Sequence, residues 1–191
     1  FARGSYVVVY DAEDRPQPGQ LRLAVETFRR APTTLGCAQA RLNIYNPHQS
    51  WISRQFTIEY TVLFDAILPT LERYGLPVPL GGTSNHFRRE TLERVSAWDP
   101  FNVTEDADLG IRLARLGYTT AVLNSTTWEE APTTFGVWLR QRTRWVKGWM
   151  QTLLVHTRDM SALHRELGAA GTLGFHAIFA GLVMSALVQP L

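Results

Sequence analysis

The order of apolar and polar positions divides the chain into short apolar runs and longer stretches with helical spacing. The apolar runs predict strands at 6–10, 36–46 and 120–124. The helical spacing predicts helices at 20–30, 51–74, 89–95 and 134–156, with another that starts at the acidic group 105–108. Strands that alternate with helices indicate an α/β sheet. The β-branched run at 6–10 is typical of the middle of a parallel sheet.

The C-terminal stretch from Gly168 to Leu191 contains no charged residue. About 20 mainly apolar residues suffice to cross a bilayer, so 168–191 is predicted to start a transmembrane region. A Gly/Ala-rich core helix is the alternative. Because the chain starts with Phe1 rather than Met, we interpret it as a fragment of a longer membrane protein.

Basic residues gather ahead of that uncharged stretch. They are Arg140, Arg142, Arg144, Lys147, Arg158 and Arg165. Loops and segments rich in Lys and Arg stay on the cytoplasmic side of a membrane, so the domain that precedes the stretch is predicted to be cytoplasmic.

Composition narrows the class of protein. With 191 residues, 45% of them hydrophobic and 19% charged, the chain can bury a sizeable core. A formal net charge of only +2 argues against a protein that coats nucleic acid, and no nucleic-acid partner is expected. The single cysteine, Cys37, excludes an internal disulfide and a cysteine-rich zinc site.

An acidic loop, Y-D-A-E-D, follows the first predicted strand. It places Asp11, Glu13 and Asp14 at the carboxyl end of that strand, where ligands of α/β sheets bind. Carboxylate oxygens on a tight loop suit Mg²⁺ or Mn²⁺, which commonly bind one or two carboxylates together with phosphate oxygens. A solvated acidic turn is the alternative.

A second acidic group, T-E-D-A-D, precedes an amphipathic helix. Thr104 can cap this helix, and Glu105, Asp106 and Asp108 would meet the positive end of the helix dipole. Alternatively, one carboxylate faces a cleft and accepts a proton from an attacking hydroxyl. The spacing does not determine which of the three would do so.

A helix rich in Trp and Arg contains Q-R-T-R-W, in which Gln141 shares a face with Arg144 or Trp145. A guanidinium can bind a pyrophosphate through two hydrogen bonds, and an indole can stack on a sugar ring. The alternative is a basic interfacial helix that lies on anionic lipid. Different faces of this helix could do both.

The order of these pieces is more specific than any one of them. D-A-E-D after a strand, the glycine turn G-G-T-S at 81–84, T-E-D, Q-x-x-R-W and a membrane stretch together resemble the cellulose-synthase-like, membrane type of family 2 glycosyltransferases. The resemblance implies a nucleotide-diphospho-sugar transferase (GT-A-like, Rossmann-related) mixed sheet flanked by helices. It also implies a sheet truncated at the N-terminus, and an interfacial and a transmembrane helix after the sheet. The implied division is a partial catalytic domain at 1–157, with the interfacial helix at about 134–156, and a membrane region from 168.

Residue roles follow from the same resemblance. The resemblance assigns binding of the metal and of the nucleotide-sugar diphosphate to Asp11 and Glu13, with Asp14 as another possible metal ligand. The general base falls on Asp106, with Glu105 and Asp108 in support. Diphosphate binding falls on Arg144. Acceptor binding falls on Trp145, Gln141, Gly82, Thr83 and Ser84.

The implied activity is inverting transfer of a hexose, from a UDP-sugar donor with Mg²⁺ or Mn²⁺, to a polysaccharide or glycan acceptor at the inner (plasma) membrane. Membrane lipid would be a further partner. Glu13 stands where the family has a second aspartate, which leaves open a catalytically inactive relative that binds nucleotide or sugar. A magnesium-dependent nucleotidyl- or phosphotransferase is the third possibility.

Overall fold

The computed structural model describes residues 3–188, and within them a five-stranded sheet lies at the centre. The strands are β1 (Tyr6–Val9), β2 (Arg15–Pro16), β3 (Leu35–Ile44), β4 (Asn85–Arg88) and β5 (Thr119–Glu129). Their order across the sheet is β1-β4-β3-β5-β2. The central pair, β3 and β5, runs parallel, and the other neighbours pair antiparallel, so the sheet is mixed.

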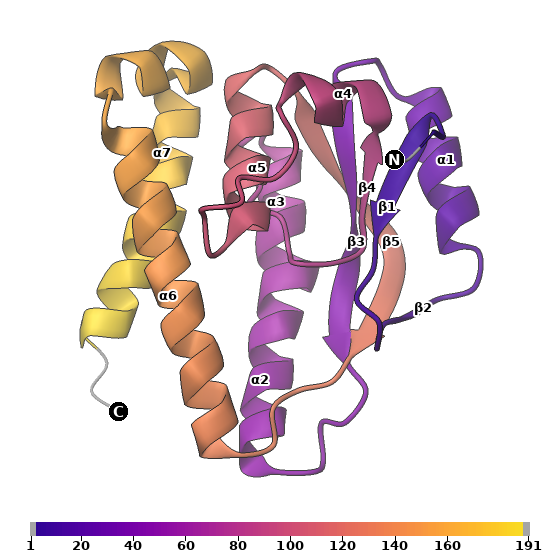
Figure 1. Cartoon of the computed structure of the whole chain (residues 1–191), viewed down its shortest axis with the longest axis vertical. Helices are drawn as coiled ribbons and strands as arrows, with labels where there is room; N and C mark the ends of the chain where they lie inside the picture. The colour runs from indigo at the N-terminus through magenta and orange to yellow at the C-terminus, as the bar shows by residue number, and fades with distance from the viewer. Residues whose placement is uncertain (1–2, 189–191) are drawn as a thin grey trace.

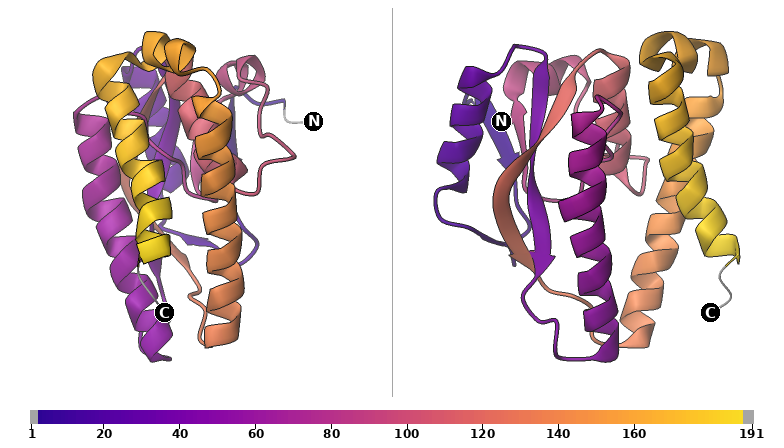
Figure 2. Two further views of the ribbon diagram at one scale, coloured as in Figure 1. Left: turned by 90° about the vertical axis from the view of Figure 1, so that its left-hand side faces the viewer. Right: turned by 180° about the vertical axis from the view of Figure 1, so that it is seen from behind.

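Helices cover both faces of this sheet (Figure 1). They are α1 (Gln20–Arg30), α2 (Trp51–Thr61), η1 (Val62–Ile67), α3 (Leu68–Arg73), α4 (Arg89–Arg94), α5 (Glu105–Arg115), α6 (Phe135–Thr157) and α7 (Met160–Val188). Helix α1 lies on one face, whereas α2, α3 and α5 lie on the other. Helices α6 and α7 form an outer layer beyond these, which Figure 2 shows from two further sides.

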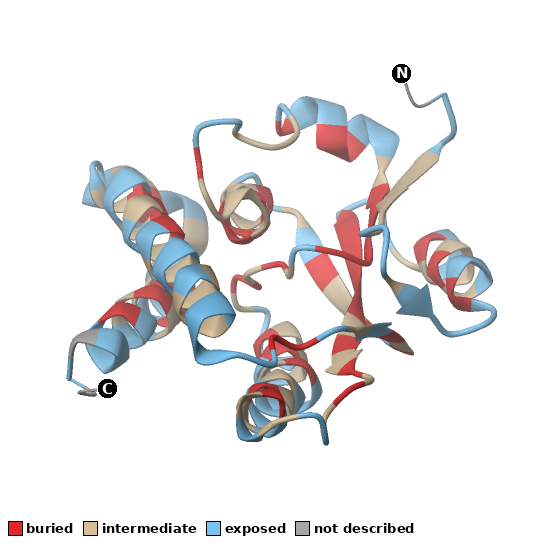
Figure 3. Ribbon diagram, turned by 60° about the horizontal axis from the view of Figure 1, so that its bottom comes forward, coloured by how far each residue is buried: buried red, intermediate tan, exposed pale blue. Residues whose placement is uncertain are grey.

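The core lies on both faces of the sheet, and Figure 3 shows the buried residues concentrated in its strands. On one face, Phe28 of α1 packs against β3 and β5. On the other, Phe64 and Leu68 pack against Leu42 of β3. The predicted α/β layering is therefore confirmed.

The first strand does not lie where its sequence predicted. The run at 6–10 was expected in the middle of a parallel sheet, but β1 forms an edge of the sheet within the described residues and pairs antiparallel with β4. All four residues of β1 are only half-buried. A continuous β-branched run indicates burial, but it does not determine the direction of the neighbouring strand.

Two strands lie wholly or partly outside the predicted strands. Residues 85–88, for which no strand is predicted, form β4 between β1 and β3. Strand β5 was expected to end at Asn124 but continues to Glu129. A register shift after Ala40 keeps β5 paired with β3 to its end. Because of this extension, Glu129 lies at the same end of the strands as the acidic loop that follows β1.

The stretch at 51–74 is helical throughout, as predicted. Its middle part, η1, has the wider π-helical turn. Ser50 starts the stretch with a reciprocal cap, in which Ser50 and Ser53 each accept a backbone N–H from the other. Gly75, with φ +62°, ends it.

Helix α7 contains residues 168–188 of the uncharged C-terminal stretch. A break at Gly168, with φ 69° and ψ 178°, separates a charged first part from the apolar remainder. Among the described residues, α7 is long and apolar enough to cross a bilayer, as judged by length and composition. Phe175 and Phe179 are buried against α5 and α6, whereas Leu173 and Met184 are exposed. Residues 189–191 of the predicted span lie outside the described residues.

Candidate active site

A cavity of about 850 Å³ lies beside the carboxyl ends of β1 and β5. Its wall is built by the loop after β1, the glycine turn before β4, the start of α5, the end of β5 and one face of α6. The acidic residues that line it are Asp11, Glu13, Asp14, Glu105, Asp106, Glu129 and Glu130. Apolar side chains of η1 and α7, including Leu63 and Leu182, complete the wall.

The acidic loop is folded around Asp14. One carboxylate oxygen of Asp14 accepts the backbone N–H of Asp11 at 2.7 Å and also the hydroxyl of Thr83. The other oxygen, Oδ1, is buried and has no partner among the described residues. Asp14 therefore closes the turn, whereas Asp11 and Glu13 remain exposed at the cavity.

Burial and then the charges of Asp14, Glu13 and Glu105 raise the pKa of Asp11. Such crowding of carboxylates favours a bound cation. Within residues 3–188, no three His, Cys, Asp or Glu side chains are grouped to form a complete metal cage. The residues present thus fit a hard divalent cation that takes one or two carboxylates, with phosphate oxygens completing its shell.

The residues of the glycine turn differ in where they point: Gly81, Gly82 and Thr83 line the cavity, and Ser84 lies in the core. A Cβ built on Gly82 would lie 3.5 Å from Oδ2 of Asp106, so the backbone here directly faces that acid. Thr83 points to the acidic loop through its bond to Asp14. Ser84 does not line the cavity: its side chain is buried and donates to Thr127 Oγ1 at 2.6 Å. The structure therefore places the Ser84 side chain in the core rather than at the cavity where the acceptor site is expected.

Asp106 lies in the first turn of α5 and lines the cavity. Trp98 Nε1 donates to Asp106 Oδ1 at 3.1 Å. Burial first, and then the charge of Glu105, raises the pKa of Asp106 to about 7, although the Trp98 bond lowers it. A carboxyl group whose pKa lies near neutral pH is suited to proton transfer. Asp106 has this property by position, which the spacing T-E-D alone could not determine.

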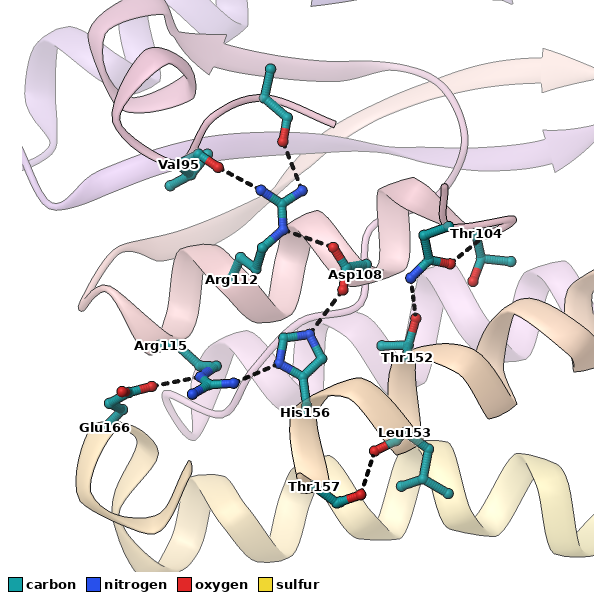
Figure 4. A network of polar contacts seen from close by, with 12 residues as sticks. Val95, Thr104, Asp108, Arg112, Arg115, Thr152, Leu153, His156, Thr157 and Glu166 are labelled. Atoms are coloured by element: carbon teal, nitrogen blue, oxygen red, sulfur yellow. Dashed lines mark hydrogen bonds and ion pairs between the residues drawn. The ribbon is translucent and has the colours of Figure 1, made fainter. Parts of the chain in front are cut away.

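Asp108 has a different role from the one its sequence predicted. Rather than acting only at the helix N-terminus, it is buried away from the cavity and accepts from Arg112 Nε at 2.7 Å and from His156 Nε2 at 2.9 Å (Figure 4). Burial raises the pKa of Asp108, but the bonds from His156 and Arg112 outweigh this and lower it overall. Thr104 occupies the N-cap position of α5, but its hydroxyl makes no capping hydrogen bond and is buried with no partner among residues 3–188.

Helix α6 presents Gln141, Arg144 and Trp145 to the cavity. Trp145 packs on Phe56 of α2 with ring centroids 5.8 Å apart. Arg142, the residue after Gln141, does not face the cavity in the same way. It pairs with Glu59 and lies over the ring of Trp145. Arg144 is exposed and remains available to a ligand.

Three polar atoms at the cavity have no partner among the described residues. They are Asp14 Oδ1, Thr104 Oγ1 and Gln141 Oε1, and all three are buried. Buried polar atoms are normally hydrogen-bonded, so their concentration at one cavity indicates a polar occupant.

The same helix is fastened to the segment before Asp106. A Cβ added to Gly148 would lie 2.4 Å from Thr104 Oγ1, so only glycine permits this approach. One turn later, Thr152 accepts from Asn102 Nδ2 at 3.0 Å. Helix α6 thus joins the cavity face around Trp145 to the segment that leads into Glu105 and Asp106.

Sequence reasoning missed Glu129 and Tyr60. Glu129, the last residue of β5, accepts from the Tyr60 hydroxyl at 3.2 Å and lines the cavity. Burial first, and then the charge of Asp14, raises the pKa of Glu129 to about 8. The strand-end rule that identified Asp11 would have found Glu129 if β5 had been predicted at its full length.

The chain is similar in sequence to proteins named as glycosyltransferases. The chain is 28% identical over 170 residues to the probable glycosyltransferase YdaM of Bacillus subtilis, covering 86% of this chain and 39% of the relative. It is 27% identical over 145 residues to probable glucomannan 4-beta-mannosyltransferase 10 of Arabidopsis thaliana, covering 75% of this chain and 26% of the relative. The chain therefore spans well under half the length of these relatives.

A solved structure has the same fold. It is the mannosyltransferase PcManGT from Pyrobaculum calidifontis in complex with GDP-Man and Mn²⁺, with a TM-score of 0.60 and 21% identity over 100% of this chain and 52% of that one. The expected GT-A-like mixed sheet with flanking helices is thus confirmed. The family model described as glycosyl transferase family group 2 matches residues 6–191. The resemblance read from the motifs is therefore confirmed, and the chain belongs to glycosyl transferase family group 2.

Proposed function

We propose that the protein is an inverting glycosyltransferase that moves a hexose from a nucleotide-diphosphate sugar to a hydroxyl of a glycan or polysaccharide acceptor at a membrane. One observation carries this proposal. A single cavity unites an acidic loop suited to a cation, a carboxyl group with a pKa near 7, and an arginine–tryptophan face. These three parts come from separate segments of the chain, and together they match the needs of sugar transfer.

The donor is assigned to the side of the cavity at Asp11 and Glu13. A Mg²⁺ or Mn²⁺ ion held there would neutralise charge on the diphosphate. Arg144, exposed at the same cavity, offers a planar fork to diphosphate oxygens. A UDP-hexose is the donor that the motifs imply. The neighbouring structure that contains GDP-Man and Mn²⁺ makes GDP-mannose the second candidate.

Asp106 acts as the general base. Its ionised carboxylate takes the proton from an acceptor hydroxyl while that oxygen forms a bond to the anomeric carbon. The bond between that carbon and the diphosphate breaks, and its electron pair leaves on the diphosphate, where Arg144 meets the charge. A single displacement of this kind inverts the configuration of the anomeric carbon.

The acceptor is assigned to the wall made by Trp145, Gln141 and the glycine turn. The Trp145 indole provides an apolar face for a sugar ring. Gln141 Oε1 is buried and has no hydrogen-bond partner in the part of the chain that the structure describes, so it can accept from a sugar hydroxyl. Gly82 lets the backbone approach closely, and Thr83 ties this turn to the acidic loop.

The membrane arrangement follows from α6 and α7. We assign residues 1–157 to a partial catalytic domain, α6 at about 134–156 to an interfacial helix, and 168–191 to the start of a transmembrane region. The basic cluster around Arg140 and Arg158 favours placement of the catalytic domain on the cytoplasmic side of the inner (plasma) membrane. Anionic lipid would be a partner of α6.

An assay of the full-length protein in lipid nanodiscs tests this function. UDP-hexoses and GDP-mannose are supplied one at a time with Mn²⁺ or Mg²⁺, and released nucleoside diphosphate is measured. The expected result is release with one donor, loss of release in EDTA, and an inverted anomeric signal in the NMR spectrum of the product. No release with any donor would favour an inactive relative, and release of pyrophosphate would favour a nucleotidyltransferase.

A further inference from the structure

A strained turn lies just before the acidic segment of α5. Ser96 and Ala97 have φ angles of 60° and 52°, in the left-handed region that residues with a side chain rarely adopt. Such a conformation persists only where the surroundings hold it in place. The turn leads directly into Trp98, whose indole contacts Asp106.

Backbone hydrogen bonds from Ser96 and Ala97 to the end of α4 hold one side of this turn, and Arg112 of α5 holds its carbonyl side. Its guanidinium donates to the backbone carbonyl oxygen of Ala97 at 2.7 Å and to that of Val95 at 2.5 Å (Figure 4). Its third contact, from Nε, is to Asp108 Oδ2 at 2.7 Å. One planar fork therefore fixes both carbonyls that flank the strained residues.

Asp108 in turn is fixed from α6. His156 Nε2 lies 2.9 Å from Asp108 Oδ1, and Arg115 Nη1 lies 2.9 Å from His156 Nδ1. Because arginine can only donate, His156 Nδ1 accepts and Nε2 carries the proton toward Asp108. This pair joins the helix that carries Trp145 to the helix that carries Asp106.

Trp98 is positioned by these contacts and by the core. Its ring meets Phe87 edge to face, with centroids 5.6 Å apart and an interplanar angle of 89°. With both the backbone and the ring fixed, the indole N–H has one direction left, toward Asp106 Oδ1 at 3.1 Å. The other carboxylate oxygen of Asp106, Oδ2, is the one nearest Gly82 in the cavity wall.

We propose that Trp98 is a positioning residue for the catalytic base, holding one oxygen of Asp106 so that the other faces the acceptor, and that Arg112 holds Trp98 in place. The proposal rests on the role assigned to Asp106 in the proposed function. An N–H donor also favours the ionised form of a carboxylate, so the contact lowers the pKa of Asp106 against the effect of its burial. Trp98 would then set both the direction and the basicity of the base.

Trp98→Phe tests this with little loss of packing, because the ring against Phe87 is kept and the N–H is removed. Loss of the donor raises the pKa of Asp106, so the acid limb of the kcat–pH profile should move to higher pH by about one unit. At neutral pH kcat should fall by about tenfold, while KM for the donor stays unchanged. Trp51→Phe is the matched control, since Trp51 is 73% exposed and outside the cavity. An acid limb that coincides with that of the wild type would overturn the proposal.

Arg112→Lys tests the second half. Lysine keeps a positive charge beside Asp108 but cannot span two carbonyls. The acid limb should move in the same direction as in Trp98→Phe, by a smaller amount. Arg89→Lys, at an exposed pair on α4, is the control. A folded Arg112→Lys protein with an unchanged profile would remove Arg112 from the proposal.

A spectroscopic readout separates this inference from the proposed function. In protein with ¹⁵N-labelled tryptophan, the indole resonance that disappears in Trp98→Phe should shift with pH, with a midpoint near the pKa of Asp106, about 7. Asp106→Asn should abolish this shift. Absence of the shift in a protein that transfers sugar would overturn the inference. A normal shift in a protein that is inactive with every donor would instead overturn the proposed function and leave the contact standing.

Discussion

The two acidic segments of the cavity differ in how the fold treats them. In the loop after β1, Asp11 and Glu13 are exposed beside Asp14. At the start of α5, Asp106 is half-buried and bonded to Trp98, and Asp108 is buried away from the cavity. Both segments are short clusters of carboxylates. The loop after β1 keeps its carboxylates together at the cavity, whereas the start of α5 separates Asp106 from Asp108.

This difference shows that the number of acids matters less than their surroundings. Crowded carboxylates on an exposed loop are relieved by a bound cation, so they suit the donor diphosphate. A single carboxyl group in a poorly solvated position has a raised pKa, so it suits proton transfer. Each segment can be changed by separate substitutions. Changes at α5 are expected to act on the rate of transfer, and changes in the loop after β1 on donor affinity.

The largest effect is expected from Asp106→Asn, which keeps the shape of the side chain and removes the proton acceptor. Transfer should fall by about 10²–10⁴-fold, the usual scale for loss of a general base. Donor binding, measured by calorimetry, should stay nearly unchanged because Asp11 and Arg144 are intact. Near wild-type transfer would contradict the assignment of the base.

The same variant has a stability signature. The folded pKa of Asp106 is raised from 3.8 to about 7, so the unfolded chain ionises first and this carboxyl group makes the fold less stable as pH rises from about 4 to about 7. The melting temperature of Asp106→Asn should therefore fall less over this interval than that of the wild type. Asp108→Asn is the contrast: it weakens a buried ion pair and should lower the melting temperature instead.

A smaller effect, on binding rather than on transfer, is expected from Asp11→Ala. Loss of a ligand to the cation should weaken donor affinity by about ten- to a hundredfold in Mn²⁺, the scale of one strong charged contact. EDTA should weaken the wild type similarly and the variant much less. Glu26→Gln, on the outer face of α1, is the control. Donor affinity that is indifferent to both changes would mean that the loop is only a solvated turn.

The smallest effect is expected from Glu105→Gln. The charge of Glu105 is the second cause, after burial, of the raised pKa of Asp106. Its removal should move the acid limb of the kcat–pH profile to lower pH, by roughly one unit or less. This shift is opposite in sign to that of Trp98→Phe. A shift to higher pH would show that Glu105 acts on Asp106 in another way.

The sequence by itself determined the local elements and the chemical types at the site. Helical spacing predicted α1 with the bounds 20–30 that the structure has, and α6 to within one residue at each end. The order of D-A-E-D, T-E-D and Q-x-x-R-W predicted the family that the comparisons confirm. These features are local, because periodicity and motif order are properties of neighbouring residues.

Only the tertiary structure decided how those residues are used. Strand direction placed β1 at an edge, and the full length of β5 brought Glu129 to the cavity. Long-range pairing with His156 removed Asp108 from the site, while the turn at Ser96 brought Trp98 to Asp106. A pKa depends on burial and on charges from distant segments, so the distinction between Asp106 and Asp108, two positions apart in the sequence, arises only when α5 packs against α6.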